Sequence, residues 1–175
     1  AKNRLYLTGS GSAHEIWHED FDLPNDKHSE ICETCVTVTW IQFNVQLLRL
    51  LGEARFAEQL EKTIYNHLLA AQKPTGDDWC YYTPLTGGKP YDHNTNCCHS
   101  SGPRGVALIP AVVYAAAGDG VTVNLFTTCS AALPLPGGGS VTLEQTTNYP
   151  LDGRTTIKVT PKDAKGPFAI CLRAP

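Results

Sequence analysis

The feature that most constrains the fold is a change in hydrophobic periodicity near residue 120. Upstream of it, apolar residues recur at helical spacing over residues 37–51 and again over 54–71, with Gly52 in the connection. Two helices joined by so short a connection should form an antiparallel hairpin. Downstream, apolar and polar residues alternate as they do in half-buried strands. The sequence therefore predicts an α+β fold, with a helical part followed by a β part.

The other segments complete this prediction. Residues 72–103 are rich in Pro, Gly, Asp and Asn, and a loop of this length inside a compact domain is usually functional. We expect a short strand at 79–82 within it and a third helix over 105–117. An antiparallel layer of four strands is expected over 121–127, 140–147, 154–160 and 167–173. These elements divide the chain into predicted domains 1–118 and 119–175.

Composition limits the classes of partner. The 175 residues are 42% hydrophobic and 18% charged, which is typical of a globular protein. The net charge is −3 and the chain has no run of Lys or Arg, so we expect no nucleic-acid partner. No apolar stretch has the length of a membrane helix, so we expect no membrane partner. The chain starts without Met or the apolar core of a signal peptide, and we interpret it as part of a larger gene product.

The most informative chemical motif is the adjacent pair Cys97-Cys98. A disulfide between neighbours strains the peptide bond between them, whereas both sulfurs can turn toward one metal ion. Glu33 and Cys35 would complete a donor set of three sulfurs and one oxygen, which suits tetrahedral zinc. One shared ion requires the four donor atoms to lie within about 4 Å of one another. Spacing alone leaves reduced structural cysteines and a purely structural zinc as alternatives.

The number of cysteines indicates the kind of cellular compartment in which the protein is found. The chain has seven cysteines, an odd number for a disulfide framework, and free thiols in this number favour a reducing, cytoplasmic location. Cys32, Cys80 and Cys171 lie in apolar surroundings, and we expect them to be small buried hydrophobes. A thiol redox protein is a weaker alternative. Cys32 and Cys35 have the spacing of a redox motif, but no strand-to-helix turn is predicted there.

Several short motifs together resemble one family. They are Asp22-Leu23-Pro24-Asn25, Glu33-Thr34-Cys35, the helix from Leu60-Glu61 to Tyr65-Asn66, Tyr81-x-x-Pro84-Leu85, Cys97-Cys98 followed by Arg104, Val123-Asn124-Leu125-Phe126 and Tyr149-Pro150-Leu151-Asp152-Gly153. In this order and spacing they resemble glycoside hydrolase family 127, the β-L-arabinofuranosidases, over roughly residues 5–175. The resemblance implies a partial α/α barrel of helical hairpins followed by part of an antiparallel β-sandwich. It also implies a barrel that begins before Ala1.

The resemblance further implies a retaining glycosidase that hydrolyses β-L-arabinofuranosides or related glycans with a zinc-bound cysteine nucleophile. Cys97 matches the nucleophile, which is also a zinc ligand. Cys98, Glu33 and Cys35 match the other zinc ligands. Glu15 matches the residue that acts as acid and base.

Other residues match positions that support the site, and a second function remains an alternative. Glu61 and Tyr81 match sugar-contacting positions, His14 is expected near the pocket, and Glu19 is the alternative to Glu15. We expect an arabinofuranoside-containing carbohydrate as partner, with a homodimer left open. The rival function is a catalytically incomplete fragment that serves as a zinc-stabilised carbohydrate-binding or structural module.

Overall fold

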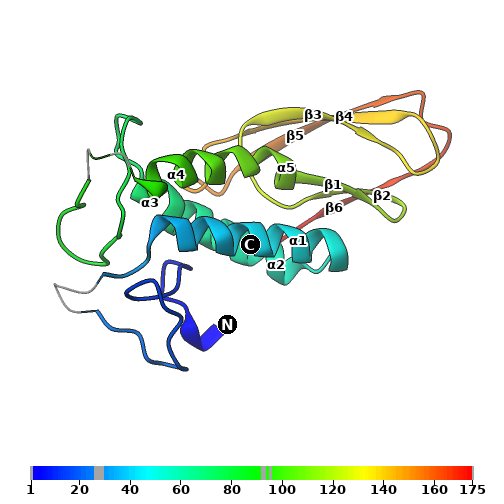
Figure 1. The fold of residues 1–175 in the computed structure, drawn as a ribbon. Helices are drawn as coiled ribbons and strands as arrows, with labels where there is room; N and C mark the ends of the chain where they lie inside the picture. Colours follow the sequence, from blue (N-terminus) through cyan, green and yellow to red (C-terminus); the bar gives the residue numbers. More distant parts are fainter. Residues whose placement is uncertain (1, 26–29, 92–93, 95, 175) are drawn as a thin grey trace. The chain divides into compact units, whose positions relative to one another are not determined.

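The computed structural model describes residues 2–25, 30–91, 94 and 96–174 (Figure 1). The chain forms two compact units, Ala1–Leu108 and Ile109–Pro175, and each is described by itself. The first contains most of the helices and the second contains the strands. The α+β fold predicted from the periodicity is confirmed.

The first unit is a group of packed helices. Its elements are a 3₁₀ turn (Lys2–Arg4), α1 (Thr34–Leu51), α2 (Ala54–Thr63), a π-helical turn (Ile64–Leu68), α3 (Leu69–Ala71) and α4 (Cys97–Leu108). Helix α1 packs against both α2 and α4. It ends at Gly52, which has φ 66° and donates its N–H to the Leu48 carbonyl at 2.8 Å, the left-handed end that favours glycine. The predicted hairpin of α1 and α2 therefore forms.

Two helix predictions need correction. The helix expected over 54–71 is interrupted by the π-helical turn, which a regular apolar stripe does not reveal. The helix expected over 105–117 is wrong at both ends. It starts at Cys97 and stops at Leu108, a short helix α5 (Pro110–Val113) follows, and residues Tyr114–Ala117 form a strand.

Helix α4 starts early because its first turn is capped and its glycines fit a close contact. The Asn96 side-chain oxygen accepts the N–H groups of Cys98 at 2.9 Å and His99 at 3.3 Å, as an N-cap residue does. A Cβ on Gly102 would lie 2.3 Å from the Trp79 ring, and one on Gly105 would lie 2.7 Å from Val38 Cγ2. Packing at these glycines overrides their poor helix propensity.

The second unit contains two three-stranded sheets rather than one four-stranded layer. Its strands are β1 (Tyr114–Ala117), β2 (Gly120–Val123), β3 (Cys129–Pro134), β4 (Ser140–Thr147), β5 (Thr155–Lys162) and β6 (Ala169–Leu172). The sheets have the orders β1-β2-β6 and β3-β4-β5. The β2–β6 pair is parallel, in contrast to the expected antiparallel layer, and the other pairs are antiparallel. Strand 140–147 is confirmed, whereas β1 and β3 were not predicted.

The two sheets share one core. Side chains from β2 and β4 form a buried cluster with Leu135; its members are Val121, Val123, Leu135, Val141 and Leu143. In the described residues no helix is long and apolar enough to cross a bilayer. Cys32 and Cys80 are buried, as expected, but Cys171 is exposed. Its neighbour Ile170 on β6 packs against this core, and successive side chains of a strand point to opposite faces.

Burial of His67 should make stability depend on pH. Its ring is 1% exposed and contacts the Thr8 hydroxyl at 2.8 Å and the Cys32 carbonyl at 3.3 Å. Burial lowers the pKa of His67 to about 4, below the value of about 6.5 in an unfolded chain. The unfolded state therefore binds a proton first as pH falls. Between pH 6.5 and 4 we expect the free energy of unfolding to fall by up to about 1.4 kcal/mol per pH unit.

Urea unfolding of the metal-free chain at pH 7 and pH 5 measures this effect. His67→Gln removes the titrating ring, so its free energy of unfolding should fall less between the two pH values than that of the wild type. His14→Gln changes an exposed ring and serves as the control. An unchanged pH dependence in His67→Gln would show that another group causes it.

Candidate metal centre

The cysteine pair meets Glu33 and Cys35 where two helices of the first unit begin. Glu33 directly precedes α1 and Cys35 lies in its first turn, while Cys97 and Cys98 open α4. One donor atom from each of these four residues lies within 4.8 Å of all the others. The structure thus brings together the four residues that the sequence proposed as one donor set.

The spacing of the donor atoms fits a tetrahedral ion. Cys98 Sγ lies 3.7 Å from Cys35 Sγ and 4.0 Å from Cys97 Sγ. Glu33 Oε1 lies 3.8 Å from Cys97 Sγ and 3.9 Å from Cys98 Sγ. A tetrahedral ion about 2.3 Å from two sulfurs separates them by about 3.8 Å. The cluster can therefore hold a metal ion without a large rearrangement.

The start of α1 is held by hydrogen bonds to the segment that contains Cys80 and Tyr81. Thr34, the first residue of α1, donates its backbone N–H to the Tyr81 carbonyl at 3.0 Å. Its hydroxyl donates to the Cys80 carbonyl at 2.8 Å. These two bonds place Glu33 and Cys35, on either side of Thr34, beside the segment that carries Tyr81.

Burial opposes the charged forms of three of the donors. It raises the pKa of the Cys35 thiol to about 11 and also raises the pKa values of the Cys98 thiol and the Glu33 carboxyl. The Cys35 thiol donates to the Ser101 hydroxyl oxygen at 3.1 Å. A bound cation favours the deprotonated forms of such groups. Cys97 differs from Cys98, because Cys97 is exposed and Cys98 is 0% exposed.

Two tyrosines hold Glu15, and one of them, Tyr81, connects it to this cluster. The hydroxyls of Tyr81 and Tyr82 donate to Glu15 Oε1 at 2.7 and 3.0 Å. The Tyr81 oxygen also lies 3.8 Å from Cys97 Sγ. The hydrogen bond to Glu15 raises the pKa of Tyr81, so the phenol stays protonated and keeps donating. The Glu15 carboxyl group, the Tyr81 phenol and the exposed Cys97 thiol thus form a chain of contacts.

The loop that carries Glu15 has an unusual backbone. Glu15 and His14 have φ values of 62° and 50°, in the left-handed region that residues with a Cβ seldom adopt. The loop is held by Ala13, which is 0% exposed and makes bridges to Ile16 and Ile31. Left-handed residues often occur at functional sites, where the surrounding contacts hold them.

The structure also places the other candidate residues, Glu19, His14 and Glu61. Glu19 pairs with Arg4 at 3.1 Å and its side chain is 88% exposed. His14 Nδ1 contacts Glu30 at 3.3 Å. Glu61 lies on α2 and is buried, with 8% exposure. The sugar-binding roles of Glu61, Tyr81 and His14 remain predictions.

Sequence reasoning missed four residues that shape the centre: Tyr82, Asn96, Ser101 and His99. Tyr82 carries no signal beyond its place beside Tyr81. Asn96 is a common N-cap residue, but Gly102 and Pro103 made the following segment resemble a loop. Neither Ser101 nor His99 could be placed without knowing that α4 begins at Cys97.

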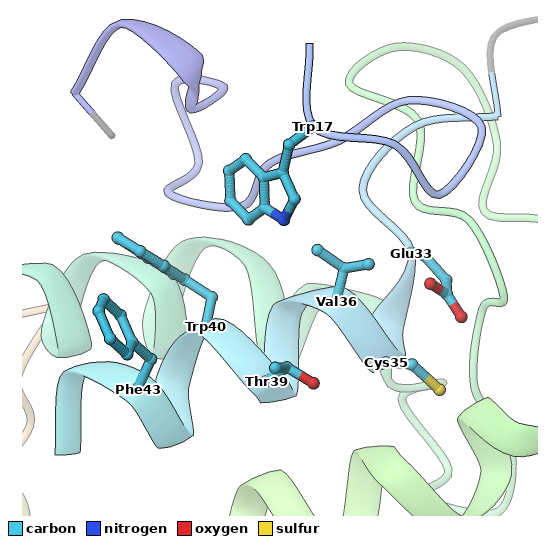
Figure 2. Close-up of a pocket in the computed structure, with 7 residues that line it drawn as sticks. All are labelled: Trp17, Glu33, Cys35, Val36, Thr39, Trp40 and Phe43. Carbon is cyan, nitrogen blue, oxygen red and sulfur yellow. The ribbon is translucent and has the colours of Figure 1, made fainter. Parts of the chain in front are cut away.

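An apolar pocket adjoins the donor cluster. Its volume is about 430 Å³, and it is lined by Trp17, Glu33, Cys35, Val36, Thr39, Trp40 and Phe43. Figure 2 shows Trp40 and Phe43 along α1, with Glu33 and Cys35 near the start of the same helix. The ring centroids of Trp17 and Trp40 are 5.9 Å apart, and those of Trp40 and Phe43 are 5.8 Å apart. The candidate ligands therefore border an aromatic surface.

Comparison with known proteins gives consistent matches. The family described as "Beta-L-arabinofuranosidase, GH127 catalytic domain" matches residues 1–111, and the GH127 middle domain matches residues 120–175. The non-reducing end β-L-arabinofuranosidase of Bifidobacterium longum subsp. longum is 29% identical, over 89% of this chain and 26% of its own length.

Two solved structures are similar as well. A GH127 β-L-arabinofuranosidase from Geobacillus stearothermophilus T6 has a TM-score of 0.86 and 26% identity, and the match covers 100% of this chain and 30% of that one. A second GH127 β-arabinofuranosidase has a TM-score of 0.86 and 32% identity, over 99% of this chain and 28% of that one. This chain thus spans less than a third of these relatives. It belongs to the GH127 β-L-arabinofuranosidase family, matching part of the catalytic domain and the middle domain.

Proposed function

We propose that the centre is the catalytic site of a retaining glycosidase that uses zinc and a cysteine nucleophile on β-L-arabinofuranosides or related glycans. The observation that supports this most is the convergence of four metal-ligand side chains with Glu15, joined through Tyr81. The relatives described as β-L-arabinofuranosidases suggest the sugar. A carbohydrate is therefore the proposed partner.

The residues fit zinc better than a hard cation. Three thiols and one carboxylate form a soft donor set, whereas magnesium and calcium prefer oxygen ligands alone. Glu33, Cys35, Cys97 and Cys98 would hold the ion. When bound, zinc would keep the thiols deprotonated at neutral pH.

The different burial of the two neighbouring cysteines supports different roles for them. Cys98 is 0% exposed and would act as a ligand only. Cys97 is exposed and lies beside Tyr81, so a substrate can approach its sulfur. We therefore assign Cys97 as the nucleophile.

The reaction would proceed in two displacements. Cys97 sulfur forms a bond to the anomeric carbon while the glycosidic C–O bond breaks, and Glu15 donates its proton to the leaving oxygen. Water then attacks the same carbon, Glu15 accepts a proton from that water, and the C–S bond breaks. Two inversions give net retention of configuration.

Several finer assignments accompany this proposal. Glu15 is preferred to Glu19 as acid and base because its carboxylate meets Tyr81, whereas Glu19 pairs with Arg4. Tyr81, Glu61 and His14 are proposed to contact the sugar. We assign residues 1–118 to the catalytic part and 119–175 to the β-sandwich part. Free thiols suit a reducing, cytoplasmic setting.

A second candidate function is a zinc-stabilised module that binds carbohydrate without cleaving it. The observation that favours it is the aromatic surface of Trp17, Trp40 and Phe43 beside the donor cluster. Zinc content together with hydrolysis of an aryl β-L-arabinofuranoside by this chain separates the two. The module would contain zinc but release no arabinose.

Removing the buried ligand should remove the metal. For Cys98→Ser we expect the zinc content, measured by elemental analysis, to fall from near one per chain to a small fraction. The reason is that a buried hydroxyl is a much weaker zinc ligand than a thiolate. Cys171→Ser changes an exposed thiol of the second unit and should keep wild-type zinc content. Equal zinc in Cys98→Ser and the wild type would contradict the proposed donor set.

Removing the nucleophile should affect activity more than metal content. We expect Cys97→Ala to abolish hydrolysis of an aryl β-L-arabinofuranoside while part of the zinc remains, because three ligands are still present. Denaturing mass spectrometry of the wild type during turnover should show a pentosyl adduct on Cys97. Substantial turnover by Cys97→Ala would exclude this residue as the nucleophile.

The acid and base assignment can be tested with two matched glutamates. We expect Glu15→Gln to lower kcat by about 10² to 10⁴ on a substrate with a poor leaving group, the usual contribution of general acid–base catalysis. The loss should be smaller on an aryl substrate whose leaving group needs no proton. Glu19→Gln is the control, and a larger loss there than at Glu15 would reverse the assignment.

A further inference from the structure

We propose that the buried Asp78 and the partly buried His99 together position the first turn of α4, so that the Cys97 and Cys98 sulfurs face Glu33 and Cys35. The inference rests on the metal centre proposed above and adds two positioning residues to it. Neither residue is one of the four candidate ligands.

The contact between the two side chains is short and sheltered. His99 Nε2 lies 2.8 Å from Asp78 Oδ1. Asp78 is 2% exposed, and the His99 side chain is 22% exposed. The same Asp78 oxygen accepts the Trp79 N–H at 2.8 Å. The carboxylate is therefore oriented by its own backbone before it meets the imidazole.

The segment that carries Asp78 is also fixed to other parts of the first unit. The Asp78 carbonyl accepts the Lys73 N–H at 2.9 Å, and Cys80 donates its N–H to the Ala71 carbonyl at 2.9 Å. Three residues after Asp78, the Tyr81 carbonyl accepts the Thr34 N–H at the start of α1. Asp78 thus belongs to the same anchored segment that places Glu33 and Cys35.

His99 transmits this anchoring to α4. It directly follows Cys98, so its position sets the backbone that carries the two cysteines. One turn further along α4, Gly102 lies against the Trp79 ring. Contacts on two successive turns of one helix restrict both its rotation and its shift along the axis. The 3.7 Å approach of Cys98 Sγ to Cys35 Sγ depends on that register.

The experiment is an anaerobic titration of the reduced chain with cobalt(II), a spectroscopic substitute for zinc. The wild type should show thiolate-to-cobalt charge-transfer bands. We expect His99→Leu to weaken cobalt affinity about 10-fold or more, the range seen when outer-shell partners of metal ligands are lost, and to change the ligand-field bands. His99→Gln should restore most of the affinity and the spectrum, because its amide can donate near the position of Nε2.

A second variant and a stability control complete the test. Asp78→Asn keeps the side-chain volume and weakens the hydrogen bond to His99, so we expect a smaller loss of cobalt affinity than in His99→Leu. Because the two residues act as a pair, the double variant should lose little more affinity than His99→Leu alone. Val45→Ala, a core truncation on α1 away from the pair, controls for general destabilisation. Asp77→Asn, an exposed neighbour, should match the wild type.

Each outcome decides the inference. Wild-type affinity and bands in His99→Leu would overturn it, as would a loss in Val45→Ala equal to that in His99→Leu. A loss of cobalt affinity in His99→Gln as large as that in His99→Leu would also overturn it. Absence of thiolate–cobalt bands in the wild type would reject the metal centre itself, and the inference with it. Cobalt binding without hydrolysis would reject only the proposed catalysis.

Discussion

The centre depends on the two hydrogen bonds by which Thr34 begins α1 against the carbonyls of Cys80 and Tyr81. Thr34 is 0% exposed, and a buried polar group without a partner costs about 1–3 kcal/mol, so the helix start and the loop are held together strongly. The donors Glu33 and Cys35 flank Thr34. The same bonds aim Tyr81 toward both Cys97 and Glu15. This contact therefore brings the candidate ligands Glu33 and Cys35 beside the segment whose Tyr81 reaches both the proposed nucleophile Cys97 and the proposed acid Glu15.

Burial then supports a link between metal binding and the proposed cysteine nucleophile. Desolvation opposes the charged forms of Cys35, Cys98 and Glu33 and raises their pKa values. Three negative donors at this spacing would repel one another without a cation. A divalent ion offsets both costs at once. In the proposed site Cys97 would share the ion and keep an exposed sulfur, so the buried donors would provide the stability and the exposed donor would remain accessible to substrate.

The sequence predicted elements well where local and long-range preferences agree. Strand β4 forms as expected over Ser140–Thr147, and its residues alternate in burial from Ser140 to Gln145. By contrast, Tyr114–Ala117 is rich in alanine, which favours helix, and becomes a strand only because it pairs with β2. The donor set could be grouped from chemistry alone, since few side chains bind soft metals. Tyr82 and His99 could not, because their roles depend on which loop meets which helix end.

The start of α4, which carries Cys97 and Cys98, shows the same conflict between local helix preference and long-range packing. Gly102, Pro103 and Gly105 are poor helix formers, and each glycine in a helix costs about 1 kcal/mol relative to alanine. Any larger residue at Gly102 or Gly105 would collide with Trp79 or Val38. The absence of a side chain lets α4 approach α1 and the 78–82 segment closely enough for Cys98 to reach Cys35. Local helix stability is thus lower where close packing assembles the donor atoms, as expected when a functional site overrides local preference.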